Sequence, residues 1–132
     1  MVLFLVAAHL ALVRFEPYLS SKSLADAIAH EVQPSDKIMI YGDQAYGSSL
    51  LFYLQRPVYL INGRTTSMAF GSQYPDAPKI FLDDTALKQA WTGSERVFLF
   101  VPPERAAAVN ALLPGAKIFG ESSGKRVLTN KQ

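Results

Sequence analysis

The sequence contains no cysteine and only two histidines, and these absences exclude several kinds of chemistry. Without cysteine there is no disulfide, no thiolate nucleophile and no cysteine-ligated metal. His9 and His30 stand far apart in the chain, and neither has a neighbour at the spacing of a zinc ligand set. No G-x-S-x-G motif marks a serine nucleophile. We therefore expect no metal, no cofactor and no self-sufficient catalytic residue.

Charge is also scarce. Only 18% of the residues are charged and the formal net charge is +2, without a basic stripe or an aromatic platform between lysines. Such a chain lacks the electrostatic footprint of a nucleic-acid-binding protein, so nucleic acid is not an expected partner. With 132 residues, 49% of them hydrophobic, the chain is long and apolar enough to bury the core of one globular domain.

The chain begins with an uncharged apolar run, residues 1–13, followed at once by Arg14. A membrane-spanning helix needs about 20 apolar residues, and a signal peptide begins with basic residues. The run by itself is therefore neither a complete membrane-spanning helix nor a signal peptide. It is typical of the last part of a transmembrane helix, which we place at residues 1–15, with a linker at residues 16–18. Residues 16–132 would then form a soluble domain. The alternative is an apolar helix packed on that domain.

Residues 37–64 carry the strongest structural pattern. An apolar strand at residues 37–41 is followed by a break and then by an apolar helical segment at residues 50–54. Pro57 ends the helix because it lacks an amide donor, and residues 58–61 form a second strand. Strand, helix and strand with short connections predict one right-handed βαβ unit with parallel strands.

The rest of the chain continues this alternation. Residues 96–101 are continuously apolar, as expected for a central parallel strand that is buried on both faces. Further helices are predicted at residues 24–32 and 106–113, with another between them that Asp83 or Asp84 caps and that Gly93 ends. A short strand or apolar anchor is predicted at 79–82, and a closing hairpin with strands at 117–119 and 126–128. The order predicts an α/β fold, a three-layer Rossmann-like α/β/α domain with a mostly parallel sheet.

Ligands of such sheets bind at the carboxyl ends of the strands, and polar residues follow three of the predicted strands there. Asp43 and Gln44 follow the first strand, Asn62 and Arg64 follow the second, and Glu104 follows the central one. Asp43 is a candidate general base or sugar ligand, with a turn or capping role as the alternative. The fork of Arg64 suits a phosphate or carboxylate, with a surface ion pair to Asp43 or Asp76 as the alternative.

Two further segments are candidates for contact with a ligand. Residues 62–78 are rich in polar residues, glycine and proline, and they predict a long irregular loop of the kind that is often functional. Gly47, Ser48 and Ser49 can bind an anion at a helix N-terminus or simply cap the helix. Tyr53 in the same helix is expected in the core.

The residue order resembles one known family. The pattern S-S-K-x-L-A-D-A-I is followed by Y-G-D-Q, S-S-L-L-F-Y-L-x-R-P-V, N-G-R-T-T-S-M-x-F-G-S, P-D-A-P and R-V-F-L-F-V-P-P. It is similar to the C-terminal extracytoplasmic domain of bacterial family 39 glycosyltransferases, a group that includes protein O-mannosyltransferases and aminoarabinose transferases. Residues 52–58 carry the most family-wide motif, and residues 62–67 resemble one subgroup.

The resemblance implies a polytopic enzyme of the bacterial inner membrane that uses a polyprenyl-phosphate-linked sugar. The family's catalytic carboxylates lie in an early extracytoplasmic loop that this chain does not contain, so no catalytic residue is carried over. The implied role is a soluble periplasmic cap over the membrane-embedded part of the same enzyme, inactive alone. Asp43, Gln44, Asn62 and Arg64 are then candidates for contact with sugar or phosphate, and two aromatic residues, Phe70 and Tyr74, for contact with lipid or acceptor.

Two rival functions remain open at this point. A free-standing α/β module anchored by its N-terminal helix would bind a partner protein and show membrane association without sugar binding. A small soluble enzyme acting near Asp43 would keep its activity in residues 16–132 alone and lose it on Asp43→Asn.

Overall fold

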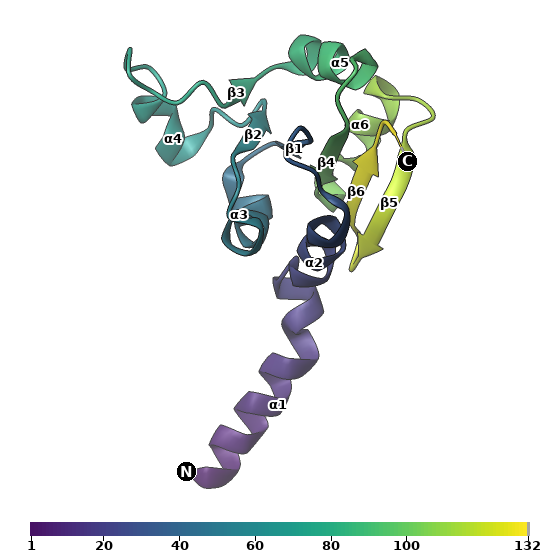
Figure 1. The fold of residues 1–132 in the computed structure, drawn as a ribbon. Helices are drawn as coiled ribbons and strands as arrows, with labels where there is room; N and C mark the ends of the chain where they lie inside the picture. The colour runs from purple at the N-terminus through teal and green to yellow at the C-terminus, as the bar shows by residue number, and fades with distance from the viewer. Residues whose placement is uncertain (132) are drawn as a thin grey trace.

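The computed structural model describes residues 1–131, leaving aside the side chains of Thr66 and Ser67, so the last residue of the predicted soluble domain, Gln132, lies outside it. The α/β prediction is confirmed: the chain folds into a mixed six-stranded sheet with helices, preceded by an apolar helix (Figure 1). The elements are α1 (Val2–Leu19), α2 (Lys22–Glu31), β1 (Lys37–Tyr41), η1 (Gln44–Gly47), α3 (Ser48–Leu54), β2 (Val58–Ile61), α4 (Thr66–Gly71), β3 (Phe81–Leu82), α5 (Asp84–Thr92), β4 (Val97–Val101), η2 (Pro103–Arg105), α6 (Ala106–Leu112), β5 (Lys117–Ser122) and β6 (Lys125–Thr129).

The strands lie in the order β3-β2-β1-β4-β6-β5. The first four in this order are parallel, and β1 pairs with β2 and β4, so the predicted βαβ unit is confirmed. The closing hairpin is also confirmed: β6 pairs antiparallel with both β4 and β5. The four parallel strands therefore have their carboxyl ends at one edge of the sheet, which is where ligands bind in such folds. The antiparallel hairpin of β5 and β6 lies beside β4.

Helices cover both faces of the sheet, which makes three layers. The even residues of β1, Ile38 and Ile40, point to one face, where α2 and α3 pack. Met39 and Tyr41 point to the other face, where α5 and α6 pack. This alternation follows from the two-residue repeat of a strand, and the two apolar cores explain why β4 is buried at every position. The narrower Rossmann-like description stays a prediction.

The segment at residues 62–78 is not the irregular loop that the sequence predicts, because it contains the helix α4. Together with the flanking loops, α4 projects from the body of the domain (Figure 1). Met68 anchors it by packing against the core on the α2 and α3 side. A helix of six residues is too short to show a helical repeat in the sequence, and its stability comes from such packing. We call residues 63–80 the arm.

The prediction of a linker at residues 16–18 is wrong, because these residues are helical: α1 continues through Pro17 to Leu19. The helix has 18 residues, all of them described, and it buries none of them. It is long and apolar enough to cross a membrane by length and composition. The alternative, a helix packed on the domain, is therefore not what the structure shows.

Candidate functional site

The carboxyl ends of β1 and β2 meet a helix start in a small polar cluster. The Tyr41 hydroxyl at the end of β1 donates to the Asp84 carboxylate in the first turn of α5 over 3.0 Å. The Asn62 amide, just after β2, donates to the same carboxylate oxygen over 2.8 Å and lies 3.4 Å from the Tyr41 hydroxyl. One carboxylate thus accepts from two different strand ends. This ties both strands to α5.

Asp43 has the capping role that was the alternative in the sequence. One of its oxygens accepts a hydrogen bond from the amide of Ala45 over 2.8 Å and caps η1, which begins at the half-buried Gln44. The other oxygen accepts from the hydroxyl of Thr65. The carboxylate therefore joins the turn after β1 to the first residues of the arm, and it stays at the strand edge where a ligand would bind.

Two glycines, Gly42 and Gly63, allow the turns after β1 and β2 to approach each other closely at this edge. The amide of Gly42 donates to the carbonyl of Ile61 over 2.7 Å, which brings the turn after β1 against the turn after β2. A Cβ atom at Gly63 would lie 2.4 Å from the carbonyl oxygen of Gly42. Between them, Asn62 has φ +53°, a left-handed conformation that asparagine tolerates better than most residues. The position of Asn62 in the cluster depends on this close approach.

Arg64 lies at the root of the arm beside a hollow of about 460 Å³, whose lining includes Asn62, Phe81 and Asp83. Its guanidinium carbon stands 5.4 Å from the ring centre of Phe81, within the range of a cation–π contact. The predicted alternative, an ion pair with Asp43 or Asp76, is absent from the ion pairs formed by the described residues. The guanidinium thus has donors to offer to an anion in this hollow.

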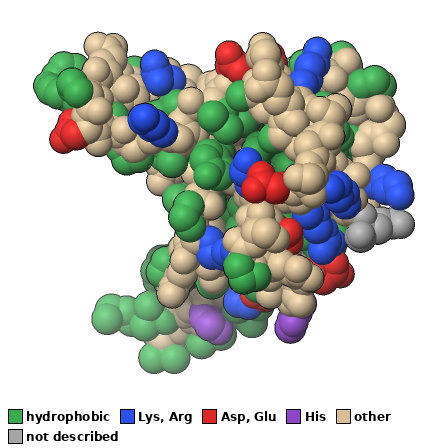
Figure 2. Space-filling view, turned by 45° about the horizontal axis from the view of Figure 1, so that its top comes forward, with side chains coloured by type: hydrophobic (Ala, Val, Ile, Leu, Met, Phe, Trp, Pro, Cys, Tyr) green, Lys and Arg blue, Asp and Glu red, His purple; other side chains and the backbone are tan. Residues whose placement is uncertain are grey.

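Phe70 and Tyr74 lie on the arm, away from the polar cluster. Their rings meet edge to face with centres 5.4 Å apart, and the residues are 71% and 53% exposed. Hydrophobic side chains gather on this projecting part of the molecule, at the upper left of Figure 2. The structure therefore splits the predicted set into a polar group at the strand ends, formed by Asp43, Gln44, Asn62 and Arg64, and an aromatic pair on the arm.

The other predicted anion site has no support in the geometry. Helix α3 begins at Ser48 without a side-chain cap, and at seven residues it is short. Gly47 is buried, and a Cβ there would lie 2.6 Å from the Cδ1 atom of Ile40. Close packing explains this glycine without an anion. At the end of β4, Glu104 is exposed in η2, next to Arg105.

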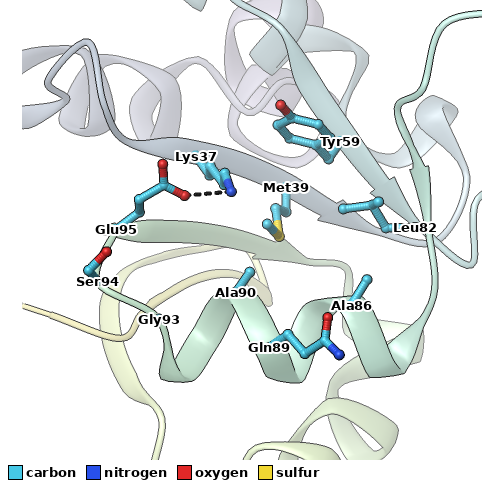
Figure 3. Close-up of a pocket in the computed structure, with 10 residues that line it drawn as sticks. All are labelled: Lys37, Met39, Tyr59, Leu82, Ala86, Gln89, Ala90, Gly93, Ser94 and Glu95. Atoms are coloured by element: carbon cyan, nitrogen blue, oxygen red, sulfur yellow. Dashed lines mark ion pairs between the residues drawn. The ribbon is translucent and has the colours of Figure 1, made fainter.

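Sequence reasoning missed a second cavity, which lies between the sheet and α5 (Figure 3). It has a volume of about 420 Å³ and is lined by Met39, Tyr59 and Leu82 from the strands. At one end, Lys37 and Glu95 form an ion pair of 2.5 Å (Figure 3). From there the cavity runs to Leu82 and Ala86, which also line the hollow beside Arg64. Its charged groups satisfy each other, so the strand-end cluster remains the better candidate site.

The Tyr41 hydroxyl gives a prediction for alkaline pH. Burial raises its pKa above the usual value of 10.0, and the hydrogen bond to Asp84 raises it further. The unfolded chain therefore loses this proton at lower pH than the folded one, and the stabilisation present below pH 10 is lost as the pH rises through the folded pKa. Tyr41→Phe should cost about 1 kcal/mol at pH 8.

That cost should shrink above pH 10, because the wild type alone loses the contribution. Urea unfolding of both proteins at pH 8 and pH 11, followed by the fluorescence of the single tryptophan, Trp91, measures the difference. Lysines and the other tyrosines titrate in both proteins and cancel. A difference that does not change with pH would contradict the assignment.

Comparisons with known proteins agree with the resemblance found in the sequence. A family model described as the aminoarabinose transferase C-terminal domain matches residues 24–129. Two crystal structures of ArnT from Cupriavidus metallidurans, one in the apo state and one bound to undecaprenyl phosphate, share the fold. Each is 21% identical with a TM-score of 0.66, and the match covers 88% of this chain.

The same match covers only 20% of the ArnT chain, so the present chain spans about a fifth of that protein. A comparison with curated protein sequences gives no match. The matched residues include every strand of the sheet, both polar segments at the strand ends and the arm. Because the family model matches most of the chain, this protein belongs to the family of aminoarabinose transferase C-terminal domains.

Proposed function

We propose that this chain is the C-terminal domain of a membrane glycosyltransferase that uses a polyprenyl-phosphate-linked sugar. In this role it covers the active site of the membrane-embedded part and helps to recognise donor or acceptor. The family match over residues 24–129 carries the proposal. The fold shared with ArnT, which has been crystallised with undecaprenyl phosphate, supports a lipid-linked partner. Transfer itself requires the membrane-embedded part, so the chain alone is inactive.

The attachment of α1 supports the orientation of such a cap. The ammonium of Lys125, in β6, donates to the carbonyls of Tyr18 and Ser20, over 2.9 Å in each case. The next residue, Arg126, pairs with Val101, the last residue of β4. The apolar helix therefore arrives at the carboxyl end of the parallel strands, the same edge that carries the polar cluster. A membrane crossed by α1 lies on that side of the domain, which we place in the periplasm.

In this proposal the polar group and the aromatic pair contact different parts of the ligand. Arg64 and Asn62 face the hollow at the root of the arm and bind the phosphate or sugar of a ligand, while Asp43 and Gln44 shape the turn beside it. Phe70 and Tyr74 offer an exposed aromatic surface to a lipid or to the acceptor. A guanidinium and an aromatic surface on one arm match a ligand with an anionic head and an apolar tail.

Arg64→Ala in the full-length transferase tests this proposal. A lost charge-assisted hydrogen bond of about 1.5 kcal/mol corresponds to roughly a tenfold lower rate of sugar transfer at subsaturating donor. Lys88→Ala on α5 removes an exposed cation from another part of the domain and serves as the matched control. Both variants should unfold at wild-type urea concentrations. Normal transfer by Arg64→Ala would remove this residue from the site.

A further inference from the structure

Helix α3 leaves an aromatic pair uncovered. Leu50 and Leu54 are buried against the sheet, whereas Phe52 is 73% exposed and Tyr53 is 41% exposed, so the expected core position of Tyr53 is wrong. The two rings meet edge to face with centres 5.1 Å apart. They form a continuous apolar surface on the outside of the domain. We call Phe52 and Tyr53 the α3 pair.

The α3 pair lies next to the point where α1 joins the domain. The Lys22 ammonium stands 5.5 Å from the ring centre of Tyr53 and forms an ion pair with Asp26 at 2.5 Å. Lys22 is the first residue of α2, three positions after the end of α1. In Figure 1, α3 lies beside α2 on the side of the domain from which α1 projects. The pair and the end of the apolar helix are therefore neighbours.

The charge pattern of α1 sets the depth of this region relative to a membrane. The helix has no aspartate, glutamate, lysine or arginine before Arg14, and both Arg14 and Glu16 stand near its C-terminal end. Apolar side chains suit the bilayer core, whereas charged ones lie at its surface. The last turn of α1, with the exposed Tyr18, then reaches the headgroup layer. The Lys125 ammonium donates to the carbonyls of Tyr18 and Ser20 at the end of α1. The helix end and the domain are therefore joined by side-chain contacts as well as by the chain.

We propose that the α3 pair rests in the headgroup layer of the bilayer that α1 crosses and holds the domain against the membrane surface. Aromatic side chains collect in this layer, where an apolar ring and a polar tip are both solvated. The pair lies beside the end of α1, which exposes two further aromatic side chains, Phe15 and Tyr18. A lipid surface, rather than a separate protein, is the occupant that this position beside α1 indicates.

The contact adds to the proposed function, because it concerns how the domain is seated and not what it binds. The chain and the contacts of Lys125 join the domain to α1 at one place, about which the domain can tilt. An aromatic contact beside α1 gives a second point of attachment and fixes the distance between the strand-end edge and the membrane.

Because the chain has no cysteine, one introduced cysteine can be labelled alone with a nitrobenzoxadiazole dye. Phe52→Cys is compared with Lys88→Cys, an exposed position on α5, in the full 132-residue chain reconstituted into vesicles of phosphatidylcholine and phosphatidylglycerol. Lipids that carry a spin label at the headgroup quench dyes in that layer. We expect several-fold stronger quenching at position 52 than at position 88, and the same result for Tyr53→Cys.

A third label at Leu10→Cys, in the middle of α1, should be quenched by a spin label deep in the acyl chains and little by the headgroup label. Equal headgroup quenching at positions 52 and 88 would overturn the proposal, and so would an α1 label that no lipid quencher reaches. The experiment measures lipid contact and not sugar transfer. A negative result therefore leaves the test on Arg64 unaffected.

Discussion

Gly63→Ala should destabilise the domain by about 3 kcal/mol or more, because no room exists for one additional methyl group. The new Cβ would lie 2.4 Å from the carbonyl oxygen of Gly42 and 2.7 Å from the Cβ atom of Leu60. Both contacts involve backbone or a buried strand residue, so neither neighbour can move aside like the end of a flexible side chain. Relief requires separation of the turns after β1 and β2, which also displaces Asn62 from Asp84.

Gly71→Ala is the matched control, because a Cβ there meets no atom within 4 Å. Gly71 is the last residue of α4, where alanine is favoured over glycine, so this variant should be neutral or gain up to about 1 kcal/mol. Urea unfolding of both variants in detergent micelles, followed by Trp91 fluorescence, gives the comparison. Equal stability of the two variants would show that the turns separate without cost.

The sequence allows the central elements to be predicted because their patterns are local. The apolar run at residues 96–101 can satisfy a strand buried on both faces, and Pro57 separates a helix from the next strand without reference to other parts of the chain. The arm was not predictable in this way. α4 depends on Met68 reaching a core that is built from α2, α3 and the sheet. The continuation of α1 past Pro17 was missed because proline usually marks a boundary.

The sequence predicted at which edge of the sheet the candidate site lies, but not which side chains form a cluster there. The rule that ligands bind at strand ends correctly brought Asp43 and Asn62 to one edge of the sheet. Tyr41 and Asp84 were missed, because the first looked like the last residue of an apolar strand and the second like one of two capping acids. Their contact joins positions 43 residues apart and depends on where α5 begins relative to β1. A tyrosine that ends a buried strand was the available signal, since its hydroxyl needs a partner.

Asp84→Ala should destabilise the domain by about 2–3 kcal/mol, the second large effect that the structure predicts. The substitution removes the acceptor of the buried Tyr41 hydroxyl and of the Asn62 amide together. It also removes a negative charge from the first turn of α5, which contributes about 0.5 kcal/mol through the helix dipole. Asp84→Asn keeps a carbonyl oxygen in the same place and should recover part of the loss. Asp83 retains its own capping bond to the amide of Ala86 in both variants.

A double-mutant cycle with Tyr41→Phe separates the hydrogen bond from the other effects of Asp84. If the hydroxyl and the carboxylate stabilise each other, the double variant should be more stable than the sum of the single losses predicts, by about 1 kcal/mol. Additive losses would mean that Asp84 acts on α5 and Asn62 alone. Coupling would instead show that β1, β2 and α5 are held as one unit at the strand ends. In that case the root of the arm, and with it Arg64, is fixed in place before any ligand binds.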